Sequence, residues 1–119
     1  MSYALITGAS SGIGRHYALQ LAERGYNIIA VSNQPAELDT IVGELTSQYG
    51  VKAYSICANL AQEGAALSIF TRCKEEGWDV EILICNAGML LFSQLINTPA
   101  PQLERIIALH CTTPTKLCQ

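Results

Sequence analysis

Short apolar runs alternate with longer amphipathic segments along this chain. The short runs occupy positions 3–6, 27–31, 51–57 and 80–85, and they are bounded by glycine or polar residues. Runs of this kind are typical of strands that are buried on both faces. The pattern therefore predicts four strands.

Between these strands, apolar residues recur at the spacing of one helix face. The spacing predicts helices over about 13–22, 35–49 and 65–76, each ended by a following glycine. The residues expected on their buried faces are Ile13, Tyr17, Ala18, Leu21 and Ala22 in the first helix, Leu38, Ile41, Val42 and Leu45 in the second, and Ala65, Ala66, Ile69, Phe70 and Cys73 in the third. A last amphipathic segment, 98–109, predicts a further helix, which Pro114 would kink or restart.

Strand–helix alternation with strands that lack a polar face predicts an α/β fold. Since crossovers between parallel strands are right-handed, the doubly wound arrangement is the commonest solution. We therefore expect one domain, residues 1–119, with a three-layer doubly wound parallel sheet (Rossmann) of about four strands. The sheet would be incomplete, because an apolar fourth strand is normally covered by a fifth. Such an open edge pairs readily with another chain, so we expect a homo-oligomer.

Composition narrows the classes of partner. Half of the residues are hydrophobic and the net charge is −3, which favours a packed globular domain and argues against a nucleic-acid partner. No apolar run approaches the roughly 20 residues of a membrane helix. The N-terminus also lacks the basic start of a signal peptide, so we expect no membrane partner. The five cysteines include no Cys-x-x-Cys pair, and we expect free thiols, no metal site and a cytoplasmic location.

A glycine-rich turn joins the first predicted strand to the first helix. Gly8, Gly12 and Gly14 stand at this junction, where a tight turn needs backbone conformations that glycine adopts at low cost. The free N–H groups and the dipole of the helix start would bind a pyrophosphate, with Ser10 and Ser11 as hydroxyl donors. A turn of purely structural purpose is the alternative. No Gly-Lys-Ser/Thr ends the turn, which disfavours a nucleoside-triphosphate enzyme.

The spacing Gly-x-x-x-Gly-x-Gly carries a family resemblance. Residues 7–14, Thr-Gly-Ala-Ser-Ser-Gly-Ile-Gly, resemble the cofactor turn of the short-chain dehydrogenase/reductase family. A second element, Asn86-Ala87-Gly88, follows the fourth strand, where that family usually has Asn-Asn-Ala-Gly and where Cys85 takes the first Asn position. The resemblance covers essentially the whole chain. It implies a nicotinamide dinucleotide cofactor and hydride transfer to or from a carbonyl or alcohol substrate.

The resemblance also implies cofactor-binding roles for individual residues. The family's adenine-side acidic residue and its apolar neighbour fall at Asn59 and Leu60, and the position near the ribose 2′-hydroxyl falls at Ser32 and Asn33. No carboxylate there repels a 2′-phosphate and no arginine holds one, so NADP is slightly favoured over NAD. Ordinary turn residues facing water are an equal alternative for Ser32 and Asn33. At the glycine turn, Arg15 would add positive charge near the pyrophosphate. The expected cofactor-binding residues are Gly8, Ser10, Ser11, Gly12, Ile13, Gly14, Ser32, Asn33, Asn59, Leu60, Asn86, Ala87 and Gly88.

Catalytic residues are scarce. The family's reaction uses a Tyr-x-x-x-Lys pair, in which lysine lowers the tyrosine pKa and tyrosine moves the proton. None of the five tyrosines here has a lysine four residues later, so we expect the catalytic half to lie beyond residue 119. The family's helical asparagine falls at His110, which could relay a proton or simply pack within its helix. The chain is therefore expected to be the dinucleotide-binding half of an oxidoreductase, inactive alone. The alternative is a non-catalytic dinucleotide-binding or self-associating module.

Overall fold

The computed structural model describes residues 2–9, 12–60, 62, 64–86, 100–101, 104 and 116–118. Within them, four parallel strands form one sheet in the order β3-β2-β1-β4. The elements in chain order are β1 (Tyr3–Thr7), α1 (Gly12–Glu23), β2 (Asn27–Ser32), α2 (Pro35–Tyr49), β3 (Ala53–Cys57), α3 (Ala65–Glu76) and β4 (Val80–Cys85). The predicted α/β sheet of about four parallel strands is therefore confirmed.

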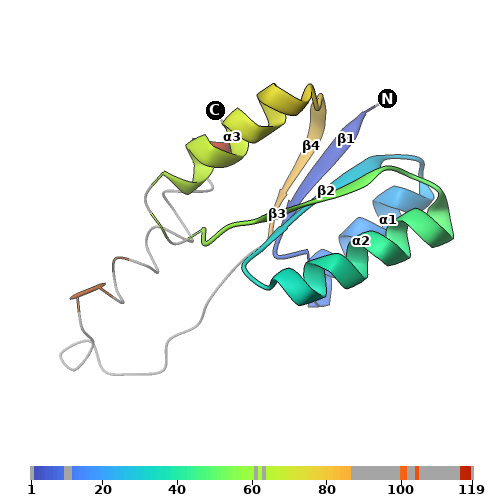
Figure 1. Ribbon diagram of the computed structural model, residues 1–119, viewed down its shortest axis with the longest axis horizontal. Helices are drawn as coiled ribbons and strands as arrows, with labels where there is room; N and C mark the ends of the chain where they lie inside the picture. The colour runs from blue at the N-terminus through green and yellow to red at the C-terminus, as the bar shows by residue number, and fades with distance from the viewer. Residues whose placement is uncertain are drawn as a thin grey trace.

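Helices cover both faces of the sheet (Figure 1). Helices α1 and α2 lie on one face and α3 lies on the other. Right-handed crossovers explain this arrangement: the chain moves outward from β1 to β2 and β3, then reverses direction to reach β4 on the other side of β1. The three layers that the sequence predicts are thus present, and the reversal between β1 and β4 creates a switch point at the sheet's centre.

Alternate residues of the central strands enter two separate cores. Ala4 and Ile6 of β1 pack with α1 and α2, whereas Leu5 packs with α3. Strand β2 is buried along its whole length, but β3 and β4 are only partly buried because each has a strand on one side only among the described residues. Glu81, on β4, is exposed. The apolar fourth strand is thus at an edge of the described sheet.

The buried face of α1 differs from the expected one. The helix buries Gly14, Ala18 and Ala22, while Ile13 is 66% exposed and Tyr17 is 46% exposed. Small residues let a helix approach the sheet closely, and the helix turns its larger side chains outward. Ile13 and Tyr17 were therefore predicted wrongly as core residues.

Helix α3 also departs from its predicted face at one position. Ile69 and Cys73 are buried as expected, but Phe70 is 61% exposed. It follows Ile69 directly, and because successive residues of a helix point about 100° apart, Phe70 lies to one side of the face on which Ile69 and Cys73 are buried.

The element boundaries follow the sequence closely. Pro35 opens α2, and glycines end α2 and α3 at positions 50 and 77, as predicted. Strand β3 begins two residues later than the apolar run that predicts it. The predicted helix over 98–109 and its restart at Pro114 lie almost wholly outside the described residues. None of the described helices is long and apolar enough to span a membrane.

Candidate functional site

The glycine turn lies at the carboxyl end of β1, at the switch point between β1 and β4. Gly8 and Gly12 have φ values of 68° and 59°, in the left-handed region that residues with a side chain rarely adopt. The Gly8 N–H donates a hydrogen bond of 2.8 Å to the carbonyl of Val31. This hydrogen bond holds the turn against the neighbouring strand β2. The first residues of α1 therefore lie at the carboxyl ends of the strands.

Gly12 and Gly14 meet opposite surroundings. A Cβ at Gly14 would overlap the carbonyl oxygen of Gly8 and would lie 2.6 Å from Nδ2 of Asn86. A Cβ at Gly12 would have no atom within 4 Å. The helix start is thus pressed against the strand end at Gly14 and open at Gly12. The backbone at Gly12 carries no side chain that would block access, and the backbone at Gly14 is held in place by its neighbours. A ligand can therefore approach the N–H groups of this helix start closely.

Thr7 and Asn86 join the ends of β1 and β4. The Asn86 N–H donates to Oγ1 of Thr7 at 2.9 Å, and that hydroxyl donates to the carbonyl of Ile84 at 3.5 Å. The Asn86 side chain donates through Nδ2 to the carbonyl of Gly8 at 3.5 Å. Asn86 therefore supports the glycine turn from the neighbouring strand. Thr7 was not among the predicted site residues, although its place directly before the first glycine was the available signal.

The end of β2 presents one buried and one exposed polar side chain. Ser32 is 7% exposed, and its Oγ accepts a hydrogen bond of 3.2 Å from the N–H of Gln34. Asn33 is exposed and precedes α2. No lysine or arginine occurs between residues 32 and 37, and Glu37 lies in the first turn of α2. Of the two predicted 2′-position residues, Asn33 is the one that solvent and ligands reach.

The end of β3 lies beside the end of β2. The Ala58 N–H donates to the carbonyl of Ser32 at 2.9 Å. Asn59 follows and is exposed, whereas Leu60 is 6% exposed and packs in the core beneath α3. Asn59 is thus accessible at the carboxyl ends of the strands, where the glycine turn also lies. Leu60 belongs to the buried core next to it. Ser10, Ser11, Ala87, Gly88 and His110 lie outside the described residues.

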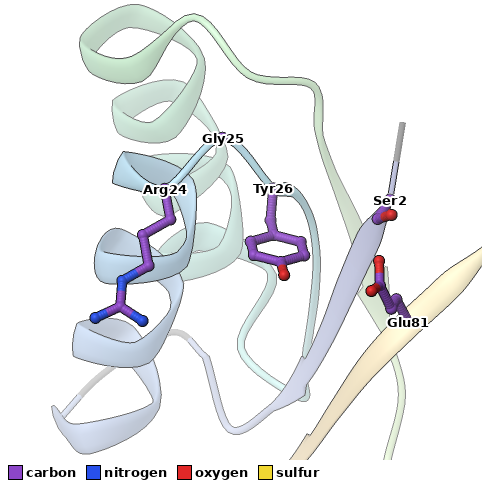
Figure 2. A pocket seen from close by; sticks show the side chains of 5 residues that line it. All are labelled: Ser2, Arg24, Gly25, Tyr26 and Glu81. Carbon is purple, nitrogen blue, oxygen red and sulfur yellow. The ribbon is translucent and has the colours of Figure 1, made fainter.

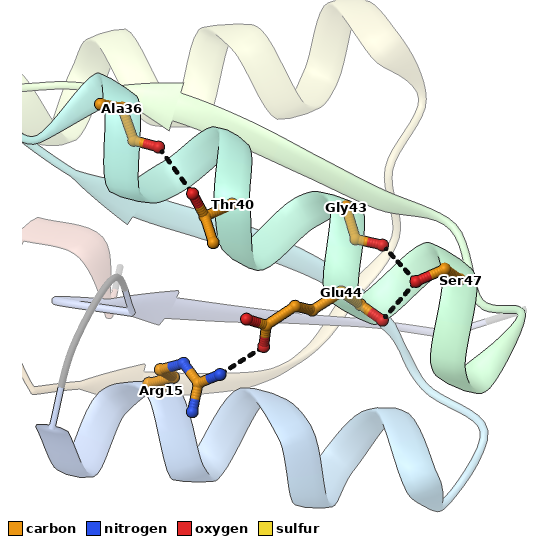
Figure 3. Close-up of polar contacts among 6 residues, drawn as sticks. All are labelled: Arg15, Ala36, Thr40, Gly43, Glu44 and Ser47. Atoms are coloured by element: carbon orange, nitrogen blue, oxygen red, sulfur yellow. Dashed lines mark hydrogen bonds and ion pairs between the residues drawn. The ribbon is translucent and has the colours of Figure 1, made fainter.

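Arg15 does not supply a free positive charge at the turn. Its guanidinium forms an ion pair with the carboxylate of Glu44, which links α1 to α2 (Figure 3). Both side chains are about one-third exposed, at 37% and 31%. The sequence indicated the charge of Arg15 but not its partner, which lies 29 positions further along the chain.

A pocket at the opposite end of the sheet offers little chemistry. Ser2, Arg24, Gly25, Tyr26 and Glu81 line it, and in Figure 2 the Arg24 side chain extends away from Tyr26 and Glu81. Burial, together with the neighbouring Tyr54, raises the pKa of Tyr3 near this end. Among the described residues, no three His, Cys, Asp or Glu side chains form a metal-binding group.

An open parallel sheet with a glycine turn at its switch point defines the doubly wound class of nucleotide-binding folds. A sequence profile of the short chain dehydrogenase family matches residues 2–119. The chain belongs to that family, as the glycine turn and Asn86-Ala87-Gly88 indicate.

Individual relatives agree with this assignment. The chain is 36% identical over 122 residues to a very-long-chain 3-oxoacyl-CoA reductase of Pyrenophora tritici-repentis, covering 99% of this chain and 36% of that protein. The bulky-bulky ketone specific alcohol dehydrogenase from Comamonas testosteroni has the same fold, with a TM-score of 0.90, 36% identity, and coverage of 99% and 47%. A short-chain dehydrogenase from Sphingobium yanoikuyae in complex with NADPH gives a TM-score of 0.90, 34% identity, and coverage of 99% and 46%. This chain thus spans about a third of the length of the curated relative and about half of the solved structures.

Proposed function

We propose that this chain is the dinucleotide-binding part of a short-chain dehydrogenase/reductase, with NADP(H) as the preferred cofactor. The observation that carries the proposal is the contrast between two glycines of one turn: Gly14 is pressed against Gly8 and Asn86, while Gly12 is open. Glycines that end helices, such as Gly50, are also open, but among the described glycines only this turn joins an open glycine to a tightly packed one at the start of a helix. Together they form a supported cradle of N–H groups at the start of a helix, where phosphates bind.

In this proposal the pyrophosphate lies over the start of α1. Gly8, Gly12 and Gly14 shape the turn, Ser10 and Ser11 donate hydroxyl hydrogens, and Ile13, which is largely exposed, contacts the cofactor with its side chain. Asn59 and Leu60 hold the adenine side. Asn86, Ala87 and Gly88 line the ribose side, next to the switch point where ligands of such sheets bind.

The preference for NADP(H) rests on the end of β2. Neither Ser32 nor Asn33 carries a negative charge, and the exposed amide of Asn33 can donate to a 2′-phosphate. The NADPH complex of the Sphingobium relative supports the same preference. The absence of a cation at this strand end keeps the preference modest, because charge-assisted hydrogen bonds are about twice as strong as neutral ones.

The bound cofactor would supply a hydride for reduction of a carbonyl, or accept one from an alcohol. The residues of this chain hold and orient the cofactor in that reaction. We propose that His110, at the family's helical asparagine position, relays a proton. Since the sequence contains no Tyr-x-x-x-Lys pair, the chain by itself is expected to bind the cofactor without turnover.

The test is calorimetric titration of the 119-residue chain with NADPH and NADH, using two matched variants. Gly12→Ala and Gly50→Ala place a side chain at similar left-handed φ values, 59° and 65°, and both Cβ atoms enter open space. The two variants therefore carry similar backbone strain, but Gly50 ends α2, far from the turn. We expect Gly12→Ala to weaken NADPH binding at least about tenfold, a loss of about 1.4 kcal/mol, and Gly50→Ala to leave it unchanged. Equal loss in both variants, or no binding by the unsubstituted chain, would refute the proposal.

A second candidate is a non-catalytic module that binds a dinucleotide or associates with a second copy. The position of β4 at the edge of the described sheet favours it, because Ile82, Leu83 and Ile84 are only partly buried there. We propose a homo-oligomer that forms through this edge in the cytoplasm. Sedimentation over a range of protein concentrations tests the association, and a monomer at every concentration would exclude it.

A further inference from the structure

The ion pair between Arg15 and Glu44 joins the start of α1 to α2, next to the proposed cofactor site. Arg15 directly follows Gly14 in the first turn of α1, whereas Glu44 lies in the second half of α2. In Figure 3 the Arg15 side chain extends from α1 towards the carboxylate of Glu44. Glu44 therefore holds the guanidinium between the two helices.

A cation in the first turn of a helix is electrostatically unfavourable. The N-terminus of a helix carries a partial positive charge, which repels cations and attracts anions. Helix α1 nevertheless has no acidic residue in its first turn, and the charge that compensates Arg15 comes from α2. An anionic ligand at the start of α1 would be attracted both by the helix dipole and by Arg15.

Arg15 is the cation best placed to reach such a ligand. Its Cα lies about 4.5 Å along the helix axis from Gly12, and side chains of a helix lean towards its N-terminus. Charges act over roughly 8 Å at physiological salt, so Arg15 acts on an anion at the glycine turn. Within the described sheet and its three helices, the other cations lie towards the amino ends of the strands, where α1 and α3 end and β3 begins: Arg24, Lys52, Arg72 and Lys74.

The contact between Arg15 and Glu44 is open to competition. The two side chains are partly exposed, at 37% and 31%, and ion pairs of this kind contribute little to stability. A phosphate monoester carries almost two negative charges and three acceptor oxygens, against one charge and two oxygens for a carboxylate. A phosphate near the starts of α1 and α2 therefore competes with Glu44 for the guanidinium.

We propose that Glu44 is a positioning residue that limits the preference for NADP(H) by competing with the 2′-phosphate for Arg15. This inference rests on the proposed function, in which the 2′-phosphate lies at Asn33, directly before α2. Both α1 and α2 begin at the carboxyl ends of the strands, so Asn33 and Arg15 lie at the same end of these helices. With NADP(H) bound, Arg15 turns from Glu44 to the phosphate, and with NAD(H) bound it stays with Glu44.

Calorimetric titration of the 119-residue chain with NADPH and NADH tests the competition, because two single variants break the same ion pair. If the pair only braced the helices, Glu44→Gln and Arg15→Met would weaken NADPH binding alike. Competition gives opposite results. We expect Glu44→Gln to strengthen NADPH binding at least about threefold and Arg15→Met to weaken it at least about threefold. Binding of NADH, which has no 2′-phosphate, should change by a smaller factor in each variant.

Further variants separate this effect from net charge and from stability. The double variant Arg15→Met/Glu44→Gln should bind NADPH like Arg15→Met, because Glu44 acts only through Arg15. Glu76→Gln removes the same charge from the exposed pair with Arg72 on α3, and it should leave NADPH binding unchanged. The melting temperatures of Arg15→Met and Glu44→Gln should fall alike and only slightly, since each variant loses the same pair.

Several results would overturn the inference. These are weaker NADPH binding in both single variants, equal gains in Glu44→Gln and Glu76→Gln, or equal changes for the two cofactors. If the unsubstituted chain binds NADPH and Glu44→Gln leaves that binding unchanged, this inference alone fails. If the unsubstituted chain binds neither cofactor, the proposed function fails and this inference fails with it.

Discussion

The carbonyl oxygen of Gly8 occupies the space that a side chain on Gly14 would need. A Cβ at that position would overlap it and would also lie 2.6 Å from Nδ2 of Asn86. The ends of β1 and β4 and the start of α1 therefore meet at Gly14, where there is room for a hydrogen atom but not for a methyl group. The stability of the fold and the shape of the turn depend on the same glycine.

Gly14→Ala is expected to lower the free energy of unfolding by about 1–3 kcal/mol, because backbone atoms must move apart to admit the methyl group. Urea denaturation followed by the fluorescence of Trp78 measures the change. Trp78 is the single tryptophan, is 8% exposed, and is stacked on Tyr54 at 4.7 Å, so its emission reports on the packed core.

Gly43→Ala is the control for that substitution. Gly43 lies within α2, and a Cβ there would meet no atom within 4 Å. Alanine is the better helix former by about 0.5–1 kcal/mol, so this variant should be more stable than the unsubstituted chain. If both variants were destabilised alike, tight packing at Gly14 would not be the cause.

Thr7→Val removes the hydroxyl that connects the ends of β1 and β4. The N–H of Asn86 would lose its acceptor at 2.9 Å in a part-buried position, and an unsatisfied group of this kind costs about 1–3 kcal/mol. Amide hydrogen exchange should show faster exchange at Asn86, alongside lower stability in urea. Thr40→Val is the comparison, because the exposed Thr40 hydroxyl donates to the carbonyl of Ala36 within one helix (Figure 3). That variant should change stability by no more than about 0.5 kcal/mol, and an equal loss in both would argue against a special role for Thr7.

The ion pair of Arg15 with Glu44 should contribute little to stability despite joining two helices. Both side chains are partly exposed to solvent, at 37% and 31%, and exposed pairs are typically worth about 0.2–1 kcal/mol. A double-mutant cycle with Arg15→Met and Glu44→Gln should give a coupling energy in that range, decreasing at high salt. Arg72 and Glu76, one turn apart on α3 and both 47% exposed, provide a reference cycle with a similar or smaller value. A coupling that salt does not weaken would contradict a solvent-screened pair.

Asn33→Asp should reverse the proposed cofactor preference. A carboxylate at the end of β2 would repel a 2′-phosphate and could accept a hydrogen bond from a 2′-hydroxyl. We expect NADPH binding to weaken by about tenfold or more, equivalent to about 1.4 kcal/mol, while NADH binding stays equal or improves. Gln48→Glu adds the same charge at an exposed position near the other end of α2, and it should affect both cofactors equally. Parallel losses in the two variants would mean that net charge, not position, governs the effect.

Much of the fold was predictable because its signals are local. Strand β4 has the predicted boundaries, and α2 begins at Pro35 and ends before Gly50, since proline, glycine and apolar spacing act within a few residues. The site was predictable in part. The sequence marks Gly8, Gly14 and Asn86 through two separate motifs, whereas their close approach and the bond from Asn86 to Thr7 depend on strands 79 positions apart in the chain.

By itself, the sequence determined the four strands, the helix periods, and the glycine turn that marks the family. Tertiary structure decided which of the available contacts form. Ile13 and Phe70 point outward although their spacing allows burial. Arg15 pairs with Glu44, although nothing in their spacing indicates that they are partners. The physical reason is that periodicity describes one segment at a time, while the order β3-β2-β1-β4 and the close approach of α1 determine which segments meet.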